Sequence, residues 1–501
     1  MITVASAWAQ TKPDPKREFR AVWIATVTNI DWPIGRKPPA QQKQDLIDIF
    51  DSHQETGINA IIFQVRPAAD AFYAKSTEPW SQWLTGKQGL APDPFYDPLE
   101  FAITEAHKRG MELHAWFNPY RATFSPNETG LSPNHITKIH PEWFLTYGGT
   151  KLFNPGIPEV REYIVQIILN VVDNYDIDGV HMDDYFYPYA IPGQRINDIE
   201  TFNKYNNGIT NIEDWRRDNV NRLIRMLADS IHDHNPRMKF GISPFGIWKN
   251  KRQDPEGSIS RGGDSYYELY ADSRKWVKEG WVDYIVPQIY WPFGNPPAAF
   301  ENLVDWWSNN TFGKQLYIGQ AAYRIGEQRR TSGFHSAAEG PNQMKYIRKN
   351  DRIQGSVFFS SASLTSNPLG FTDSLRETYY RNPALPPPMI WLDSIPPNPP
   401  KGFDITIKPR SFILTWKAPD EARDKEPVYG YVIYRFEDPN ADKNHLKLDD
   451  PQNILHIQYD TSTKFEDKTI AAGKVYTYVV TAIDRLKNES YPSNPVRITT
   501  K

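Results

Sequence analysis

The chain of 501 residues has no cysteine and no apolar run of the ~18 residues needed to span a bilayer. Without cysteine there is no disulfide, no thiol nucleophile and no Cys-ligated metal. The net charge of −3 gives no electrostatic reason to expect nucleic acid or an anionic membrane as a partner. The chemistry must therefore rest on oxygen and nitrogen side chains, and we expect neither a metal nor another cofactor.

A Gly-rich phosphate-binding turn is also missing after the early strands, which argues against a doubly wound nucleotide-binding sheet. Instead, short apolar runs alternate with helical patterns, and we expect helices over 41–55, 98–108, 158–175 and 215–232. Strands are expected at 20–26, 58–66, 111–118, 178–184, 239–245, 282–290, 315–320 and 355–361. Eight such βα units predict a (β/α)8 TIM barrel, to which we assign residues 17–382.

The composition changes after Tyr380. Residues 383–400 contain eight prolines and are expected to form a stiff, extended linker. Residues 401–501 show the period-two alternation of strands separated by turns, which predicts a small all-β sandwich. This part resembles a fibronectin type III module, whose expected role is spacing or packing. At the other end, Ala7-Trp8-Ala9 fits a signal-peptidase site, so residues 1–16 are interpreted as a signal-peptide remnant and tail. We therefore expect an exported protein of the periplasm, cell envelope or extracellular space.

Two adjacent carboxylates, Asp183 and Asp184, end the fourth expected strand. In a TIM barrel the chemistry lies at the carboxyl ends of the strands, and polar side chains gather there in this sequence. We take Asp183 and Asp184 as the candidate catalytic residues. The candidate substrate-binding residues are Gln64, Arg66, His114, Asn118, Tyr120, Arg121, His181, Tyr185, Ser243, Gln288, Tyr290, Trp291, Gln320 and Tyr323.

A carboxylate pair ringed by aromatic and amide side chains suits glycoside hydrolysis, because like charge at short range leaves one carboxyl protonated. No Glu ends another strand as the usual second carboxylate. That absence favours a mechanism in which a 2-acetamido group of the substrate is the nucleophile, held by Gln288 and Tyr290. The sequence does not decide which aspartate is the acid.

Six segments, 20–26, 64–67, 114–121, 178–188, 241–246 and 287–292, resemble the glycosyl-hydrolase-like 10 family of bacterial envelope proteins. The resemblance covers about residues 17–361 and implies a TIM barrel, export and glycosidase activity. Peptidoglycan strands stripped of their stem peptides are the substrate it favours. The run 178–185 is also similar to chitinase-type barrels, but Tyr185 stands where these have a catalytic Glu.

Three alternatives stay open at this point. The protein could hydrolyse another polysaccharide, or it could be a non-catalytic glycan-binding protein of the envelope. It could also be a metal-dependent deacetylase using His181 with the aspartates, although the other histidines, such as His232 and His234, are not placed to complete a three-ligand site. The sequence does not specify linkage, endo or exo action, or oligomeric state.

Overall fold

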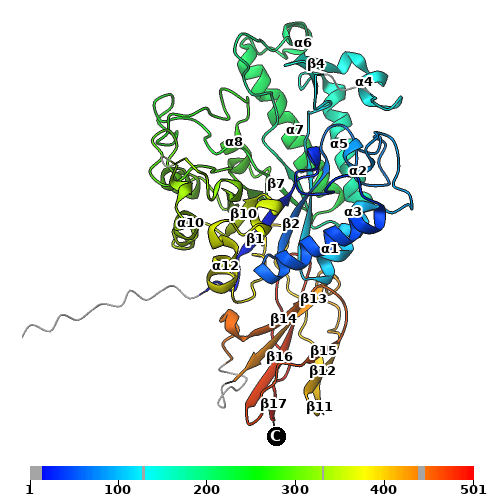
Figure 1. The fold of residues 1–501 in the computed structure, drawn as a ribbon, viewed down its shortest axis with the longest axis vertical. Coiled ribbons are helices and arrows are strands. Elements are labelled where there is room, and N and C mark those ends of the chain that lie inside the picture. The colour runs from blue at the N-terminus through cyan, green and yellow to red at the C-terminus, as the bar shows by residue number, and fades with distance from the viewer. Residues whose placement is uncertain (1–13, 127–129, 330–331, 438–445, 501) are drawn as a thin grey trace, which may run out of the picture.

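A computed structural model describes residues 14–126, 130–329, 332–437 and 446–500. Eight parallel strands close into a barrel in the order β1-β10-β9-β8-β7-β6-β3-β2, with helices around it (Figure 1). The predicted (β/α)8 barrel is thus confirmed. The expected cleavage site at Ala7–Ala9 lies outside the described residues.

The barrel strands start and end close to the predicted positions. They are β1 Phe19–Ile24, β2 Ala60–Arg66, β3 Glu112–Phe117, β6 Gly179–Met182, β7 Lys239–Ile242, β8 Tyr284–Ile285, β9 Gln315–Ala321 and β10 Gly355–Phe359. The largest difference is β8, which spans two residues where nine were expected, because Pro287 has no N–H to donate to a sheet. Pairing resumes beyond it, where Gln288 N donates to Pro244 O at 3.0 Å.

Helices follow the strands as expected for βα units. They are α1 Pro39–Thr56, α2 Gln82–Thr85, α3 Pro98–Lys108, α4 Ile136–Ile139, α5 Pro158–Asn174, α6 Ile199–Tyr205, α7 Ile212–His234, α8 Ser273–Lys278, α9 Phe300–Ser308, α10 Glu339–Arg348, α11 Ser361–Thr365 and α12 Phe371–Ser374. Capping explains some of the boundaries: Asp97 accepts N–H bonds at the start of α3, and Gly57 ends α1 with a left-handed φ of 89°. A hairpin, β4 Phe144–Tyr147 and β5 Thr150–Phe153, lies at one end of the barrel (Figure 1).

The barrel interior holds a directional chain of hydrogen bonds. Trp23 Nε1 donates to His181 Nε2 at 3.2 Å, and the other ring nitrogen of His181 lies 3.1 Å from the Tyr284 hydroxyl. That hydroxyl is 2.8 Å from His114 Nδ1, and His114 Nε2 is 3.1 Å from the Glu112 carboxylate. Burial lowers the pKa of both histidines, so each is neutral. Each ring then accepts a hydrogen bond at one nitrogen and donates one from the other. The polar side chains of the barrel interior thus form hydrogen bonds with one another, and neither imidazole needs to be charged.

The C-terminal residues form an all-β sandwich. Its strands are β11 Lys401–Lys408, β12 Ser411–Lys417, β13 Gly430–Phe436, β14 Ile454–Gln458, β15 Lys464–Asp467, β16 Val475–Ile483 and β17 Val496–Thr499. They make two antiparallel sheets, β11-β12-β15 and β14-β13-β16-β17. Trp416 of one sheet meets Tyr431 of the other at 5.2 Å between ring centroids, within an apolar core that the alternation of the sequence predicted.

The sandwich and the Pro-rich segment cover the base of the barrel, at the end away from the β4–β5 hairpin (Figure 1). Met389 is buried against the barrel interior, and Leu385 N donates to Lys16 O at 3.0 Å. From the turn after β16, the fully buried Lys487 reaches Glu112 Oε1 at 3.1 Å. The Pro-rich segment is packed against the barrel, where Gln315 Nε2 donates to Pro388 O at 3.0 Å, and it turns at Met389, whose carbonyl accepts from Leu392 N at 2.9 Å. Within the described residues, no helix is both long and apolar enough for a membrane span.

Candidate active site

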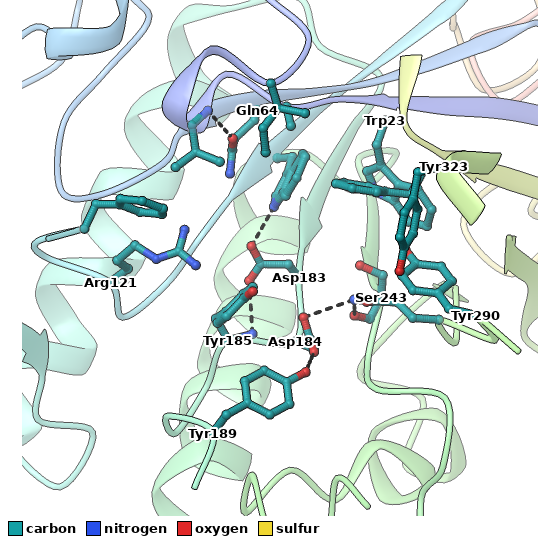
Figure 2. A pocket seen from close by; sticks show the side chains of 17 residues that line it. Trp23, Gln64, Arg121, Asp183, Asp184, Tyr185, Tyr189, Ser243, Tyr290 and Tyr323 are labelled. Carbon is teal, nitrogen blue, oxygen red and sulfur yellow. Dashed lines mark hydrogen bonds between the residues drawn. The ribbon is translucent and has the colours of Figure 1, made fainter. Parts of the chain in front are cut away.

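A cavity of about 340 Å³ opens at the carboxyl end of the barrel strands, within the size range of ligand pockets (Figure 2). Strand ends supply Trp23, Gln64, Trp116 and Asp183, and the connecting loops supply the rest of its wall. Most of the lining is aromatic or aliphatic. The lining residues are Trp23, Ala25, Val27, Ile30, Gln64, Trp116, Arg121, Phe124, Asp183, Asp184, Tyr185, Tyr189, Ser243, Gln288, Tyr290, Tyr323 and Phe359.

Asp183 is a buried carboxylate surrounded by N–H donors. Its Oδ2 accepts from Trp116 Nε1 at 2.9 Å and from Asn118 Nδ2 at 3.1 Å. Its Oδ1 accepts from the backbone N–H of Tyr185 at 3.2 Å (Figure 2). These donors fix the orientation of the carboxylate without neutralising it, because none carries a charge.

Asp184 is held by two donors of its own. Its Oδ1 accepts from Gln288 Nε2 at 3.1 Å, and its Oδ2 accepts from the Tyr189 hydroxyl. Gln288 Nε2 also donates to Ser243 O at 2.9 Å, so both of its amide hydrogens are used. Gln288 therefore positions Asp184 and has no hydrogen left for a substrate acetamido oxygen, which corrects the role expected for it.

Burial raises the pKa of both aspartates. That of Asp183 rises to about 6, first through burial, with Arg121 opposing the rise and the negative charge of Asp184 adding to it. The pKa of Asp184 is also raised by burial, against the donors of Tyr189 and Gln288. Because the charge of Asp184 acts on Asp183, the pair loses its protons in sequence, and Asp183 holds its proton up to about pH 6. An acid and a base thus lie side by side.

Gln64 presents a free donor to the cavity. Its Oε1 accepts from the backbone N–H groups of Thr26 and Val27 at 3.0 and 2.9 Å, which fixes the orientation of the amide. Its Nε2 is buried and has no hydrogen-bond partner in the described structure. An unpaired buried donor costs about 1–3 kcal/mol, and a ligand acceptor would remove that cost.

The cavity brings together part of the set predicted from sequence. Asn118 lies behind the wall and donates to Asp183, so it positions that carboxylate rather than lining the cavity. Besides the two aspartates, the predicted residues that line it are Gln64, Arg121, Tyr185, Ser243, Gln288, Tyr290 and Tyr323.

Three predicted binding residues have internal partners instead, and their expected roles are corrected. Arg66 is buried in an ion pair with Glu78 at 2.6 Å, and its donors also reach backbone carbonyls. His114 and His181 face the barrel interior, as their alternation predicted, but they lie in the hydrogen-bonded chain below the cavity floor. The alternation of a strand predicts whether a side chain faces the barrel interior, but not how far below the cavity it lies along the barrel axis.

Three others also lie outside the cavity. Tyr120 is buried beside it and contributes to a neighbouring cavity. Trp291 packs on Phe245 with ring centroids 5.5 Å apart, and Gln320 Nε2 donates to Gln343 Oε1 at 3.1 Å.

Sequence reasoning missed several residues of the cavity. Trp23 and Trp116 face the interior with the same alternation as the strand residues that were chosen, so alternation could have identified them. Phe124 and Tyr189 lie on loops, where no periodic signal points to them. The two tryptophans supply aromatic faces to the cavity, and their indole N–H groups donate to His181 and Asp183. They are therefore the most important residues missing from the predicted set.

The metal hypothesis for His181 does not fit the site. Both of its ring nitrogens are engaged, with Trp23 and Ser243 at one and Tyr284 at the other. In the described parts of the chain, three potential ligands come together at Asp393, Asp424 and Glu426, at the barrel base. The Arg237 guanidinium pairs with all three carboxylates there.

Comparisons with known proteins identify a family that this chain matches. A family model described as Glycosyl hydrolase-like 10 matches residues 18–335. Glycosyl hydrolase YngK of Bacillus subtilis (strain 168) is 46% identical over 484 residues, covering 95% of this chain and 92% of its own. Glycosyl hydrolase DigH of Escherichia coli (strain K12) is 40% identical over 372 residues, covering 70% and 84%. The glycoside hydrolase domain of PgaB (BpsB) from Bordetella bronchiseptica aligns at 13% identity with a TM-score of 0.47, over 72% of this chain and 99% of that one.

Proposed function

Because the chain belongs to the glycosyl hydrolase-like 10 family and is a glycoside hydrolase, we propose that it cleaves glycans containing N-acetylhexosamine, with peptide-free peptidoglycan strands as the substrate. The observation that carries this proposal is the nature of the acids in the cavity. Asp183 and Asp184 are the only carboxylates among its lining residues. A retaining hydrolase normally has its nucleophilic carboxylate on another strand, across the bond from the acid, and no third carboxylate lines the described wall of this cavity. We therefore infer that the acetamido group of the substrate is the nucleophile.

In the proposed reaction Asp183, with the pKa of about 6, gives its proton to the glycosidic oxygen. The acetamido carbonyl oxygen bonds to C1 as the bond from C1 to the leaving oxygen breaks. Asp184 stays ionised and stabilises the positive charge that forms on the acetamido group. Asp183 then takes a proton from water, the water oxygen bonds to C1, and the acetamido oxygen leaves. The sugar keeps its anomeric configuration.

The remaining polar groups suit the binding of such a sugar. The Gln64 amide offers a free donor to a hydroxyl or acetamido oxygen. Tyr290, expected to hold the acetamido oxygen together with Gln288, lines the cavity and keeps that role in the proposal. The rings of Trp23, Trp116 and Tyr323 offer apolar faces to the C–H groups of a pyranose. Export is part of the proposal, because peptidoglycan lies outside the cytoplasm.

The proposal is tested by incubating the protein with denuded peptidoglycan, intact peptidoglycan and de-N-acetylated denuded strands, with products read by mass spectrometry. We expect cleavage of denuded strands, little of intact ones, and none after de-N-acetylation. Asp183→Asn and Asp184→Asn should each lower the rate by 10²–10⁴-fold, the usual contribution of a general acid or base. Equal turnover of acetylated and de-N-acetylated strands would refute the substrate-assisted mechanism, and cleavage of other polysaccharides alone would refute the substrate.

The roles within the pair are separated by an aryl glycoside whose leaving group needs no proton. Such a substrate should restore much of the rate to Asp183→Asn, which lacks the acid, but not to Asp184→Asn. The reverse pattern would exchange the two roles.

A further inference from the structure

A second cavity of about 430 Å³ adjoins the first. Arg121, Phe124, Tyr185 and Tyr189 line both cavities, so the two share a wall rather than lying apart. The hairpin of β4 and β5 closes the far side of the second cavity through Tyr147, Thr150, Lys151 and Leu152.

Large apolar side chains are exposed along the shared wall and, at Ile191, on the second cavity. Phe124 is 41% exposed, Tyr185 42%, Tyr189 39% and Ile191 37%. Single exposed apolar residues are ordinary on a protein surface, but a contiguous group beside a catalytic cavity marks a ligand surface. Rings at such positions can stack on successive sugars of a chain.

The charge of the second cavity has one sign. Its lining residues include Arg121 and Lys151 and no Asp or Glu. Neither cation forms an ion pair within the described parts of the chain. Arg121 lies over the Tyr185 ring at 4.4 Å from its centroid, at the boundary of the two cavities. Lys151 is half-buried in β5 and lines the second cavity but not the first.

We propose that the second cavity is a subsite for the neighbouring sugar of the chain, and that Lys151 with Arg121 selects a sugar that bears a carboxylate. The inference rests on the proposed function, since it places the adjoining sugar beside the bond that Asp183 and Asp184 cleave. A peptide-free peptidoglycan strand has such a carboxylate, the free lactyl group, on every second sugar. In intact peptidoglycan this group is an amide and carries no charge. The cations therefore discriminate against strands that still bear peptides.

The experiment measures binding, so that it does not depend on cleavage. Isothermal titration is run on Asp183→Asn protein with a denuded peptidoglycan tetrasaccharide, and with the same tetrasaccharide after its lactyl carboxylates are converted to amides. Lys151→Gln, added to this background, should weaken binding of the acidic ligand about tenfold, the effect of one charge-assisted hydrogen bond of about 1.4 kcal/mol. Binding of the amide should not change. Lys151→Arg keeps the charge and should restore the preference, and Lys138→Gln, outside the cavity, is the matched control.

Each outcome decides between the two proposals. Tighter binding of the acid that is lost in Lys151→Gln supports the subsite, even where wild-type protein fails to cleave the strand and the hydrolytic proposal falls. Equal affinity for acid and amide overturns the charge selection and leaves the hydrolase intact. An equal loss for both ligands in Lys151→Gln also overturns it, because it would show a general effect on the hairpin.

Discussion

The mouth and the base of the barrel both bury carboxylates, but with opposite electrostatics. At the mouth, uncharged donors hold Asp183 and Asp184, and burial raises their pKa values. At the base, Lys239 and Lys487 hold the pKa of Glu112 well below its usual range, and His107 and Arg485 do the same for Asp178. The same degree of burial thus gives carboxyls ready to exchange protons at one end and permanent anions at the other.

The difference lies in where the cations come from. The base receives Arg485 and Lys487 from the sandwich, so the C-terminal residues complete charge pairs that begin in the barrel. At the mouth the nearest cation, Arg121, forms no ion pair with either aspartate in the described residues and instead faces the cleft. We conclude that charge is neutralised where it stabilises the fold and left unneutralised where a substrate must be bound and protonated.

The largest effect should follow removal of the anion at the base. Glu112→Gln leaves the buried Lys239 and Lys487 without their carboxylate and should lower the free energy of unfolding by about 3–5 kcal/mol. Urea denaturation at pH 7 measures it, with the exposed Glu162→Gln on α5 as a control that should stay within about 0.5 kcal/mol. The folded pKa of Glu112 is lowered, so its contribution is present above pH ~4.5 and is lost as pH falls through the folded value. A small loss at pH 7 would refute the charge pairing at the base.

The same kind of substitution should have opposite signs at the two ends. Asp183→Asn should stabilise the protein at pH 7–8, because ionising a group whose pKa rises from 3.8 to about 6 costs up to about 3 kcal/mol. Loss of one acceptor facing Trp116 or Asn118 reduces the gain to about 1–2 kcal/mol. The folded state binds the proton more tightly, so the gain shrinks as pH falls from 6 towards 4. Asp178→Asn should instead destabilise the protein above pH 4.

Thermal unfolding of the two variants from pH 4 to 8 checks this prediction. A loss of stability in both variants at pH 8 would mean that Asp183 is paired in the same way as the base carboxylates.

Removing one of the two lysines at the base should matter less than removing the shared anion. Lys487→Met leaves Glu112 paired with Lys239 at 2.6 Å and fills the space with an apolar chain. It gives up the contacts of the ammonium with the Tyr429 and Tyr459 rings, at 4.3 and 4.5 Å. We expect a loss of about 2 kcal/mol in unfolding free energy and unchanged kcat/KM. Lys474→Met, exposed on the same sandwich, is the control, and a large fall in kcat/KM would show that the base acts on the site.

The two ends also differ in how far the sequence predicts them. The mouth is encoded locally: Gln64 lies near the end of β2 and Asp183 directly follows β6. The alternation of each strand, together with the location of TIM-barrel chemistry at the carboxyl ends of strands, is enough to find them. The base is not encoded locally. Lys487 lies in a polar turn, Arg485-Leu-Lys-Asn488, which is typical of a solvent-exposed hairpin, yet it is fully buried. Its partner Glu112 is 375 residues away in the sequence, and only the docking of two domains brings them together.

Arg66 shows the same limit within the barrel. Its place at a strand end is typical of a substrate-binding arginine, but Glu78, in the following loop, pairs with it. Whether a polar residue at the rim is free for a ligand depends on loop partners, and loop conformation follows from packing rather than periodicity. Tyr189 and Lys151, both in elements that no alternation marked as functional, were missed for the same reason.

The smallest predicted effect concerns one donor at the mouth. Trp116→Phe removes the N–H that favours the ionised form of Asp183, so the pKa of that carboxyl should rise further, by about one unit, or about 1.4 kcal/mol. Since the protonated form is the proposed acid, the alkaline limb of the pH–rate profile should move up from near pH 6. Trp23→Phe loses an indole from the same cavity, but one that donates to His181, and its limb should not move. A shift of equal size in both variants would attribute the effect to hydration of the cavity, whereas a shift in Trp116→Phe alone assigns the limb to Asp183.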